Sequence, residues 1–331
     1  MLKGKKILIT GGTGSLGQAL TERLLKENVD TIRILSRNES KQVEMESKYD
    51  DNRLRFLIGD IRDKERLQKA FEDIDIIFHA AALKHVDVIE YNSFEALKTN
   101  VIGSQNVIDV AIDQNVETVV GIGTDKAVSP LNTYGATKLL MEKFFVSANH
   151  YVNPAHYRTK FFTLRYGNVV GSSGSVIPKF IDQIKRNKII TMTDPSMTRF
   201  SITMGDTFEF IINSLKKGKG GEVFVPKLKS FRLDMLTEVL FDLVGEGKIK
   251  QIPVRLGEKF HEVLINEDEL RHTMESKDDF MIVIPHPKVS KLPTKFPGYK
   301  PTALKERYSS ELVPLLTKAE LKKIIKDTGL V

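Results

Sequence analysis

The sequence predicts an α/β fold: a doubly wound parallel sheet with a smaller, intermeshed second lobe. In the first half of the chain, short β-branched and apolar runs alternate with helical patterns. This alternation is typical of a parallel sheet with helices on both faces. Most of the strand-like runs are continuously apolar rather than alternating in polarity, as expected of strands that are buried on both faces.

The expected elements follow from these runs in chain order. Strands are predicted at residues 6–10, 31–35, 54–58, 74–79, 118–123 and 160–165, and helices at residues 15–26, 65–71, 94–115 and 134–149. After about Gly171 the pattern loosens, Pro and Gly become more frequent, and shorter helices are expected at 176–186 and 233–243. We therefore expect residues 1–170 to form the sheet domain. Residues 171–331 would form mainly the second lobe and a C-terminal tail, with some segments returning to the sheet.

Composition narrows the class of protein. The 331 residues, 41% of them hydrophobic, are enough for a packed core, and the absence of cysteine rules out disulfides and cysteine-based metal sites. No apolar run approaches the ~20 residues of a membrane span, and the N-terminus lacks the apolar segment of a signal peptide. We expect a cytoplasmic protein with no membrane partner, and we predict no metal site.

The net charge of +7 is spread over the chain. Lys and Arg are mixed with Asp and Glu, and no basic block is interleaved with aromatic residues, so we expect no nucleic-acid partner. The run KKGKGG at 216–221 is typical of a helix end followed by a solvated turn. A diphosphate ligand would account for some of the excess positive charge.

A glycine-rich turn joins the first strand to the first helix. Gly11, Gly14 and Gly17 form the pattern G-x-x-G-x-x-G. Glycines at this spacing allow a tight turn, close approach to a pyrophosphate, and close packing of helix on strand. The helix N-terminus favours the phosphate charge. The sequence therefore predicts a dinucleotide site of the Rossmann type.

The end of the second strand bears on the choice of cofactor. It reads Ser36-Arg37-Asn38-Glu39, with Lys41 close behind. Arg37 favours NADP, because an arginine there accommodates the 2′-phosphate, whereas Glu39 leaves NAD as the alternative. Asp60 ends the third strand, where it would either accept a hydrogen bond from the adenine amino group or cap a helix beginning near Arg62.

Two polar groups of residues are candidates for the chemistry. Tyr134 and Lys138 form Y-x-x-x-K at the start of a helix, so we expect the ammonium beside the phenol, where it would lower the phenol pKa. Such a phenolate is a base for a hydroxyl proton while hydride leaves the same carbon.

Ten residues earlier, Thr124-Asp125-Lys126 stands at the carboxyl end of a strand, where ligands collect in open α/β sheets. Hydride transfer needs only the hydroxyl, so the carboxyl and the amine suggest further acid–base chemistry. The alternative is a polar loop in which Asp125 and Lys126 pair with each other.

Together these motifs resemble the UDP-N-acetylglucosamine 4,6-dehydratases that invert C5, a branch of the extended short-chain dehydrogenase/reductases. The Thr-Asp-Lys triplet is the specific part, and Asp87 departs from the Pro of the family's KHVP. The tail from Arg307 is similar to that of capsule-type members. The resemblance spans GGTGSLG at 11–17, SRNESKQ at 36–42, IGDIRDKERL at 58–67, residues 79–111, TDKAVSPLNTYGATK at 124–138, TLRYGNVVGSSGSVIPKF at 163–180, MTRF at 197–200 and RLGEKFHE at 255–262.

The resemblance implies a lyase mechanism. Tyr134, assisted by Lys138 and Thr124, would take the C4 hydroxyl proton as hydride passes to NADP. Lys126 would then remove the C5 proton, and Asp125 would protonate the departing C6 hydroxyl. For Lys126 to act as a base its pKa must fall, through burial or a neighbouring cation such as Lys84.

The resemblance also implies binding residues and an assembly. The substrate is expected to be a UDP-sugar, and relatives suggest a homo-oligomer, a hexamer or a dimer. The helix at 94–115 would serve such an interface, or would equally serve as a core helix. For Arg199 and Arg255, the expected phosphate ligands, the alternative is an ion pair. Expected cofactor contacts are Gly11, Thr13, Gly14, Ser15, Leu16, Gly17, Ser36, Arg37, Asn38, Lys41, Asp60, Ile61, Ala80, Ala81, Ala82, Lys84, Asn100, Tyr134 and Lys138, and expected substrate contacts are Lys84, His85, Asn168, Val176, Arg199, Arg255 and Glu258.

Other functions remain compatible with the sequence. A 4-epimerase or a reductase acting on a sugar nucleotide would use the same scaffold. A non-catalytic dinucleotide-sensing protein is the rival of a different class, although the presence of Tyr134, Lys138, Asp125 and Lys126 disfavours it.

Overall fold

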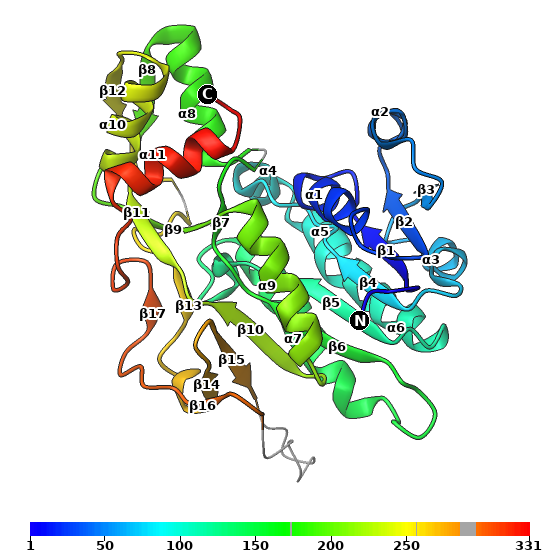
Figure 1. Ribbon diagram of the computed structural model, residues 1–331. Helices are drawn as coiled ribbons and strands as arrows, with labels where there is room; N and C mark the ends of the chain where they lie inside the picture. Colours follow the sequence, from blue (N-terminus) through cyan, green and yellow to red (C-terminus); the bar gives the residue numbers. More distant parts are fainter. Residues whose placement is uncertain (173, 256, 285–295) are drawn as a thin grey trace.

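The computed structural model describes residues 1–172, 174–255, 257–284 and 296–331. Its largest element is a 10-stranded sheet of the order β16-β14-β15-β10-β6-β5-β4-β1-β2-β3 (Figure 1). Seven neighbouring strands of this sheet, β3, β2, β1, β4, β5, β6 and β10, run parallel. Strands β15, β14 and β16 add an antiparallel edge beside β10. Their bounds are β1 Lys6–Thr10, β2 Thr31–Ser36, β3 Leu54–Ile58, β4 Ile76–His79, β5 Thr118–Ile122, β6 Lys160–Leu164, β10 Glu222–Pro226, β14 Thr273–Glu275, β15 Asp279–Val283 and β16 Lys300–Pro301.

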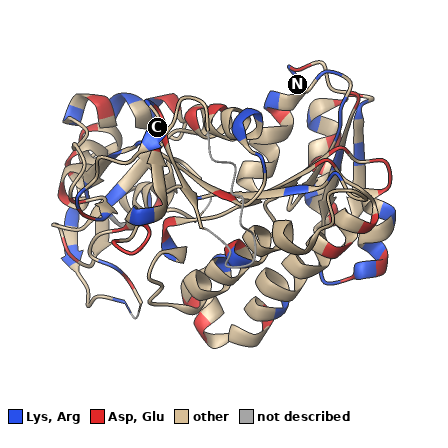
Figure 2. Ribbon diagram, turned by 90° about the horizontal axis from the view of Figure 1, so that it is seen from below, with Lys and Arg blue, Asp and Glu red and all other residues tan. Residues whose placement is uncertain are grey.

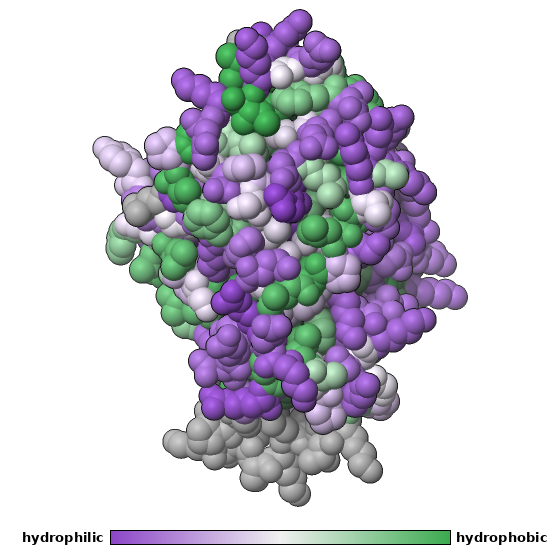
Figure 3. Space-filling model, turned by 90° about the vertical axis from the view of Figure 1, so that its left-hand side faces the viewer, coloured by the Kyte–Doolittle hydropathy of each residue, from purple (hydrophilic) through white to green (hydrophobic). Residues whose placement is uncertain are grey.

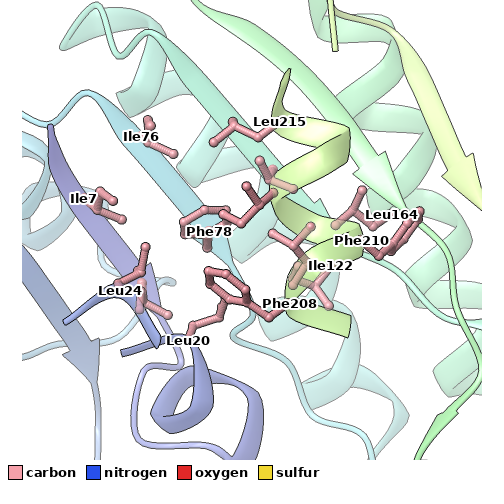
Figure 4. Close-up of a cluster of buried hydrophobic side chains, with 14 of the residues drawn as sticks. Ile7, Leu20, Leu24, Ile76, Phe78, Ile122, Leu164, Phe208, Phe210 and Leu215 are labelled. Carbon is pink, nitrogen blue, oxygen red and sulfur yellow. The ribbon is translucent and has the colours of Figure 1, made fainter. Parts of the chain in front are cut away.

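Helices cover both faces of this sheet, which confirms the predicted doubly wound fold. On one face, apolar side chains of α1 and α9 pack against strand residues such as Ile7 and Phe78 (Figure 4). Met45 of α2 belongs to the same cluster. On the other face, α3, α6 and α7 pack against Leu8, Ile77 and Phe161. The bounds of these helices are α1 Ser15–Leu24, α2 Glu39–Tyr49, α3 Lys64–Phe71, α6 Gly103–Asp113, α7 Thr133–Tyr151 and α9 Met204–Lys217.

The helix predicted at 94–115 is present as one helical run, but it contains a π-helical segment. The structure has α4 (Val86–Tyr91) and α5 (Ser93–Ala96), then a π-helical segment, η1 (Leu97–Ile102), which continues directly into α6. A π-turn widens the helix by one residue and is often found near functional sites. Here it contains Asn100, one of the expected cofactor contacts. The apolar pattern could not reveal the π-helical segment, because both kinds of turn bury similar residues.

The second lobe lies at one end of the sheet (Figure 1). Its helices α8 (Val176–Asn187), α10 (Leu233–Val244) and α11 (Lys318–Asp327) share an apolar core with residues of β8, such as Ile190 and Met192. Small sheets complete it, of order β12-β8, β11-β9-β7 and β13-β17. The strand bounds are β7 Asn168–Val169, β8 Ile189–Met192, β9 Thr198–Ile202, β11 Lys229–Arg232, β12 Lys248–Gln251, β13 Val263–Ile265 and β17 Tyr308–Ser309.

Two short 3₁₀ turns, η2 (Asp125–Ala127) and η3 (Leu270–His272), complete the elements described. Strands β10, β14, β15 and β16 of the second half lie in the main sheet, so the chain crosses between the two parts. The division at residue 170 stays a prediction. Ser173 and Leu256, which fall within two of the quoted motifs, lie outside the described residues.

The surface carries mixed charge. Lys and Arg alternate with Asp and Glu over the face seen in Figure 2, and the side of the second lobe in Figure 3 is mostly hydrophilic, with small separate apolar groups. The run KKGKGG is a helix end and a turn, as predicted: α9 ends at Lys217, and β10 begins at Glu222. Among the described residues no helix has the length and apolar character needed to cross a membrane.

Candidate active site

The glycine turn is shaped by close contacts. Gly11 has φ +67°, and a Cβ there would lie 2.8 Å from the backbone of Ala81. A Cβ on Gly17 would lie 2.4 Å from the carbonyl oxygen of Gly12. Helix α1 has Gly14 as its N-cap, without a side-chain capping bond. The turn thus forms a cradle at the positive end of α1, and a side chain at Gly11 or Gly17 would clash with its backbone. Such a cradle fits the pyrophosphate of a dinucleotide.

The residues expected near the adenosine lie at the ends of β2 and β3. Arg37 is exposed, and its Nη1 lies 3.7 Å from the Asp60 Oδ2 atom. Asn38 caps α2 by accepting a hydrogen bond from the Lys41 backbone N–H (2.9 Å), and Glu39 is the first residue of α2. The structure therefore brings Arg37 and Asp60 together. Sequence reasoning identified no helix at 39–49, because α2 buries only Gln42 and Met45.

Asp60 does not cap a helix, so the alternative based on capping is wrong. It accepts hydrogen bonds from the backbone N–H (2.9 Å) and the guanidinium of Arg62, but α3 starts at Lys64 with Asp63 as its cap. Hydrogen bonds from Arg62 and the charges of Arg62 and Arg37 lower the pKa of Asp60 against the opposing effect of burial, the largest single influence. Ionised Asp60 is available as an acceptor.

A buried polar network joins the glycine turn to the catalytic helix. The His79 ring lies 2.8 Å from Thr10 Oγ1 and 3.0 Å from Ser104 Oγ. Burial, with the charge of Lys138, lowers the pKa of His79 to about 3, so the ring is neutral. Asn100 pairs with both backbone groups of Leu83 and donates to Thr137 of α7 (3.0 Å). The segment containing Ala80, Ala81, Ala82 and Lys84 is thereby held beside α7.

The Thr-Asp-Lys triplet lies at the carboxyl end of β5, as predicted. Thr124 Oγ1 donates to Asp125 Oδ1 (2.9 Å), and Lys126 Nζ lies 3.1 Å from the same oxygen. The Asp125 side chain is buried, whereas the Lys126 side chain keeps 27% of its surface exposed. Asp125 and Lys126 are therefore paired with each other in this structure, as the alternative of a polar loop predicted.

A second carboxylate, missed by the sequence analysis, completes the cluster. Glu262 Oε1 lies 3.3 Å from Lys126 Nζ, and only 4% of its side chain is exposed. Burial favours the neutral amine, but Asp125 and Glu262 outweigh it and raise the pKa of Lys126. The two carboxylates therefore oppose the fall in pKa that Lys126 would need to act as a base. The cation that opposes the rise is Arg199 rather than Lys84.

Tyr134 and Lys138 share the face of α7, but they do not interact as predicted. Burial raises the pKa of Tyr134, while Lys126 and a hydrogen bond with Thr124 lower it. Lys138 Nζ instead donates to Met141 Sδ (3.0 Å) and is buried. Burial lowers the pKa of Lys138 to about 7, with Glu142 opposing the shift. The helical spacing correctly predicts that both residues lie on one face of α7. The Lys138 side chain, however, extends toward Met141, one helical turn further along the chain.

The residues expected to bind substrate come from the second lobe and from α4. Asn168 Oδ1 in β7 and Ser175 Oγ, at the N-cap of α8, are buried with no hydrogen-bond partner among the described residues. Val176 is the first residue of α8. A Cβ on Gly174 would lie 2.8 Å from the exposed His85 ring, so α4 meets the start of α8 here. These unpartnered groups fit an oxygen-rich ligand.

Arg199 forms ion pairs, which was the predicted alternative to phosphate binding. Its Nη2 lies 3.4 Å from Glu258 Oε1, and its Nε lies 3.9 Å from Glu262 Oε1. Arg255 is exposed, and its backbone N–H donates to Glu258 (3.4 Å). Among the described residues, no group of three or more His, Asp or Glu side chains is arranged to hold a metal ion.

The fold is that of the extended short-chain dehydrogenase/reductases. More narrowly, the chain belongs to the family described as polysaccharide biosynthesis proteins, whose family model matches residues 7–284. It is 45% identical over 284 residues to a UDP-N-acetylglucosamine 4,6-dehydratase (inverting) of Campylobacter jejuni, covering 85% of this chain and 84% of that protein. This identity confirms the resemblance that the motifs predicted.

Two further similarities extend over the whole chain. A UDP-glucose 4-epimerase of Rickettsia conorii is 37% identical over 330 residues, which is 98% of this chain and 96% of that protein. The X-ray structure of Pen from Bacillus thuringiensis superposes with a TM-score of 0.93 at 40% identity, covering 100% of both chains. The fold, including the antiparallel edge of the sheet, is therefore shared with a solved structure.

Proposed function

We propose that this protein is a lyase that removes water from UDP-N-acetylglucosamine and gives the 4-keto-6-deoxy sugar nucleotide, with inversion at C5. The observation that carries the proposal is the group formed by Thr124, Asp125 and Lys126 beside Tyr134 at the carboxyl end of β5. Oxidation and reduction alone do not require the carboxyl and the amine. The dehydratase of Campylobacter jejuni supports the choice of reaction.

Each proton transfer is assigned to one side chain. Tyr134 accepts the proton of the C4 hydroxyl, Lys126 accepts the C5 proton, which the C4 ketone has made acidic, and Asp125 donates a proton to the leaving C6 hydroxyl. The bound nicotinamide supplies a reversible acceptor for the hydride. Thr124 hydrogen-bonds to Tyr134 and to Asp125, and so orients the base and the acid together.

Lys126 has to be neutral before it accepts a proton. Asp125 and Glu262 favour its ammonium form. The proposal therefore requires that Lys126 loses this proton when substrate binds near neutral pH, and the proton goes to solvent if Asp125 already carries the one that it donates. Titration calorimetry in two buffers of different ionisation enthalpy measures this release directly.

For the cofactor, we propose NADP, held by the glycine cradle. Arg37 is exposed beside Asp60 at the end of β2, where an arginine suits a 2′-phosphate. NAD is the alternative, with Glu39 at the start of α2 as the acceptor for ribose hydroxyls. Mass spectrometry of the dinucleotide released by denaturing the purified protein distinguishes the two. The other proposed cofactor contacts are Gly11, Thr13, Gly14, Ser15, Leu16, Gly17, Ser36, Asn38, Lys41, Asp60, Ile61, Ala80, Ala81, Ala82, Lys84, Asn100, Tyr134 and Lys138.

For the substrate, we propose a site between α4 and the second lobe. The unpartnered Asn168 Oδ1 suits a hydroxyl group of the ligand, and the start of α8 at Val176, which has no side-chain cap, suits the diphosphate. Arg199 would have to exchange its ion pairs for phosphate oxygens. The remaining proposed contacts are Lys84, His85, Arg255 and Glu258.

We further propose that the protein acts in the cytoplasm as a homo-oligomer, a hexamer or a dimer, in the synthesis of a capsule or another surface glycan. Tyr91 and Phe94 support the oligomer, because these large side chains on α4 and α5 are 92% and 62% exposed. Light scattering of the purified protein gives the number of subunits.

A 4-epimerase is the second candidate. It is favoured by one observation: the Rickettsia conorii epimerase matches 98% of this chain, whereas the Campylobacter jejuni dehydratase matches 85%. Incubation with UDP-N-acetylglucosamine, followed by mass spectrometry for the mass and NMR for the C4 configuration of the product, separates the two. Loss of one water supports the dehydratase, and a product of unchanged mass with an inverted C4 centre supports the epimerase.

A further inference from the structure

Two buried carboxylates share one ammonium at the centre of the site. Lys126 Nζ lies 3.1 Å from Asp125 Oδ1 and 3.3 Å from Glu262 Oε1. The second oxygen of each carboxylate, Asp125 Oδ2 and Glu262 Oε2, is buried with no hydrogen-bond partner among the described residues. Both carboxylates contact this one ammonium, and two ionised carboxylates so close together in a buried place repel each other, so one of them is favoured to hold a proton.

The surrounding charges decide which carboxylate is ionised. Arg199 Nε lies 3.9 Å from Glu262 Oε1, and the same guanidinium hydrogen-bonds the carbonyl groups of Thr198 and Phe260, so it is fixed there. Glu262 thus has two cations within 4 Å, whereas the ion pairs of the described residues give Asp125 only Lys126. Ionisation of Glu262 is therefore favoured over ionisation of Asp125.

The position of Glu262 is set by the C-terminal tail. Its backbone N–H donates to Ser310 Oγ (2.9 Å), and the Ser310 N–H donates to the Glu262 carbonyl oxygen (2.8 Å). Ser310 is fully buried and also bonds Thr198 Oγ1 (2.7 Å), next to Arg199. The tail thereby fastens Glu262 and Arg199 to the same point, and the carboxylate cannot easily turn away from Lys126.

We propose that Glu262 is a positioning residue that keeps Asp125 protonated, and therefore able to donate a proton. As the ionised partner of Lys126 and Arg199, Glu262 neutralises the cations that would otherwise favour ionisation of Asp125. The inference rests on the proposed dehydration, in which Asp125 is the proton donor. It assigns a role to a residue that does not itself exchange a proton with the sugar.

The pKa directions agree with this geometry. Burial raises the pKa of Asp125 and Glu262 raises it further, against Lys126 and Thr124. Burial alone would raise the pKa of Glu262, but the neighbouring cations lower it overall. The charged and titratable groups that face the pair are Lys126, Tyr134, Arg199 and Lys259.

The protonation state of Asp125 is measurable in the free protein by infrared spectroscopy. A protonated carboxyl group has a C=O stretching band that a carboxylate lacks, and the spectrum of the wild type minus that of Asp125→Asn assigns this band to Asp125. We expect the band at pH 7 in the wild type and its loss in Glu262→Gln, because Asp125 then becomes the partner of Lys126. Glu262→Asp, which keeps the charge, is expected to retain the band.

Glu269→Gln is the matched control. Glu269 is also a largely buried carboxylate paired with an arginine, Arg165, at 2.9 Å, but it is not part of the cluster. This variant is expected to retain the Asp125 band. If the wild type lacks the band, or if Glu262→Gln retains it at full strength, the inference is overturned.

A second readout uses turnover. In Glu262→Gln the alkaline limb of the kcat profile is expected to move to lower pH by at least about one unit, so that kcat falls about tenfold more at high pH than at low pH. A purely structural defect would lower kcat evenly across the pH range, which would contradict the proposal. If the wild type makes no dehydrated product, the proposed function fails, while the infrared band still tests the role of Glu262.

Discussion

Replacing Lys138 with methionine is expected to make the stability of the protein less dependent on pH above neutrality. The Lys138 amine is buried, and it donates a hydrogen bond to Met141 Sδ at 3.0 Å. Its pKa falls from 10.5 in the unfolded chain to about 7 in the folded protein. Between these values the unfolded state binds more protons, so the stability of the wild type rises with pH.

The size of the effect follows from the shift. Each pH unit within this interval is worth about 1.4 kcal/mol, so between about pH 7 and pH 9.5 the wild type is expected to gain about 3 kcal/mol relative to Lys138→Met. Methionine has a similar length and no charge, so the packing difference does not vary with pH. All other titrating groups are common to both proteins and cancel in the comparison.

Urea unfolding of the cofactor-free proteins, at several pH values across this interval, measures the difference. The free energies of unfolding of the two proteins are expected to diverge in favour of the wild type as pH rises. Curves that run parallel from pH 7 to pH 9.5 would refute the reasoning, because they would mean that Lys138 keeps its ordinary pKa in the folded state.

Three other predictions concern the site. Lys126→Met is expected to abolish exchange of the C5 proton and to lower kcat about 10²–10⁴-fold; normal C5 exchange, followed by NMR in heavy water, would exclude Lys126 as the base. Gly17→Ala places a Cβ 2.4 Å from the Gly12 carbonyl oxygen, so dinucleotide affinity is expected to fall at least about tenfold by calorimetry, and an unchanged Kd would contradict the close packing. Arg37→Ala is expected to weaken NADP about tenfold more than NAD, whereas equal losses would remove Arg37 as the 2′-phosphate ligand.

The features that could be predicted from the sequence are local ones. A strand buried on both faces is a continuous apolar run, so the first six strands lie within two residues of their expected ends. The glycine turn and the Thr-Asp-Lys triplet were also found, because each is a short segment whose place after a strand fixes its place in the fold. Helices α9 and α11 were not identified in the looser second half of the chain.

The features that were missed depend on contacts across the fold or on one rotamer. Glu262 lies far from Lys126 in the chain, and contacts with β9 and with Ser310 of the tail bring its carboxylate to the amine. The family motif RLGEKFHE includes Glu262, but nothing local says which of its charges faces the catalytic group. The turn of Lys138 toward Met141 is likewise invisible in the Y-x-x-x-K spacing.

The central claim is that oxidation at C4 serves the loss of water at C6, and one isotope experiment tests it directly. The protein is incubated with UDP-N-acetylglucosamine that carries deuterium at C4, and the product is analysed by NMR. We predict a 4-keto-6-deoxy sugar with the deuterium in its C6 methyl group. A sugar that keeps its C6 hydroxyl, with the deuterium returned to an inverted C4, would contradict the account and identify an epimerase.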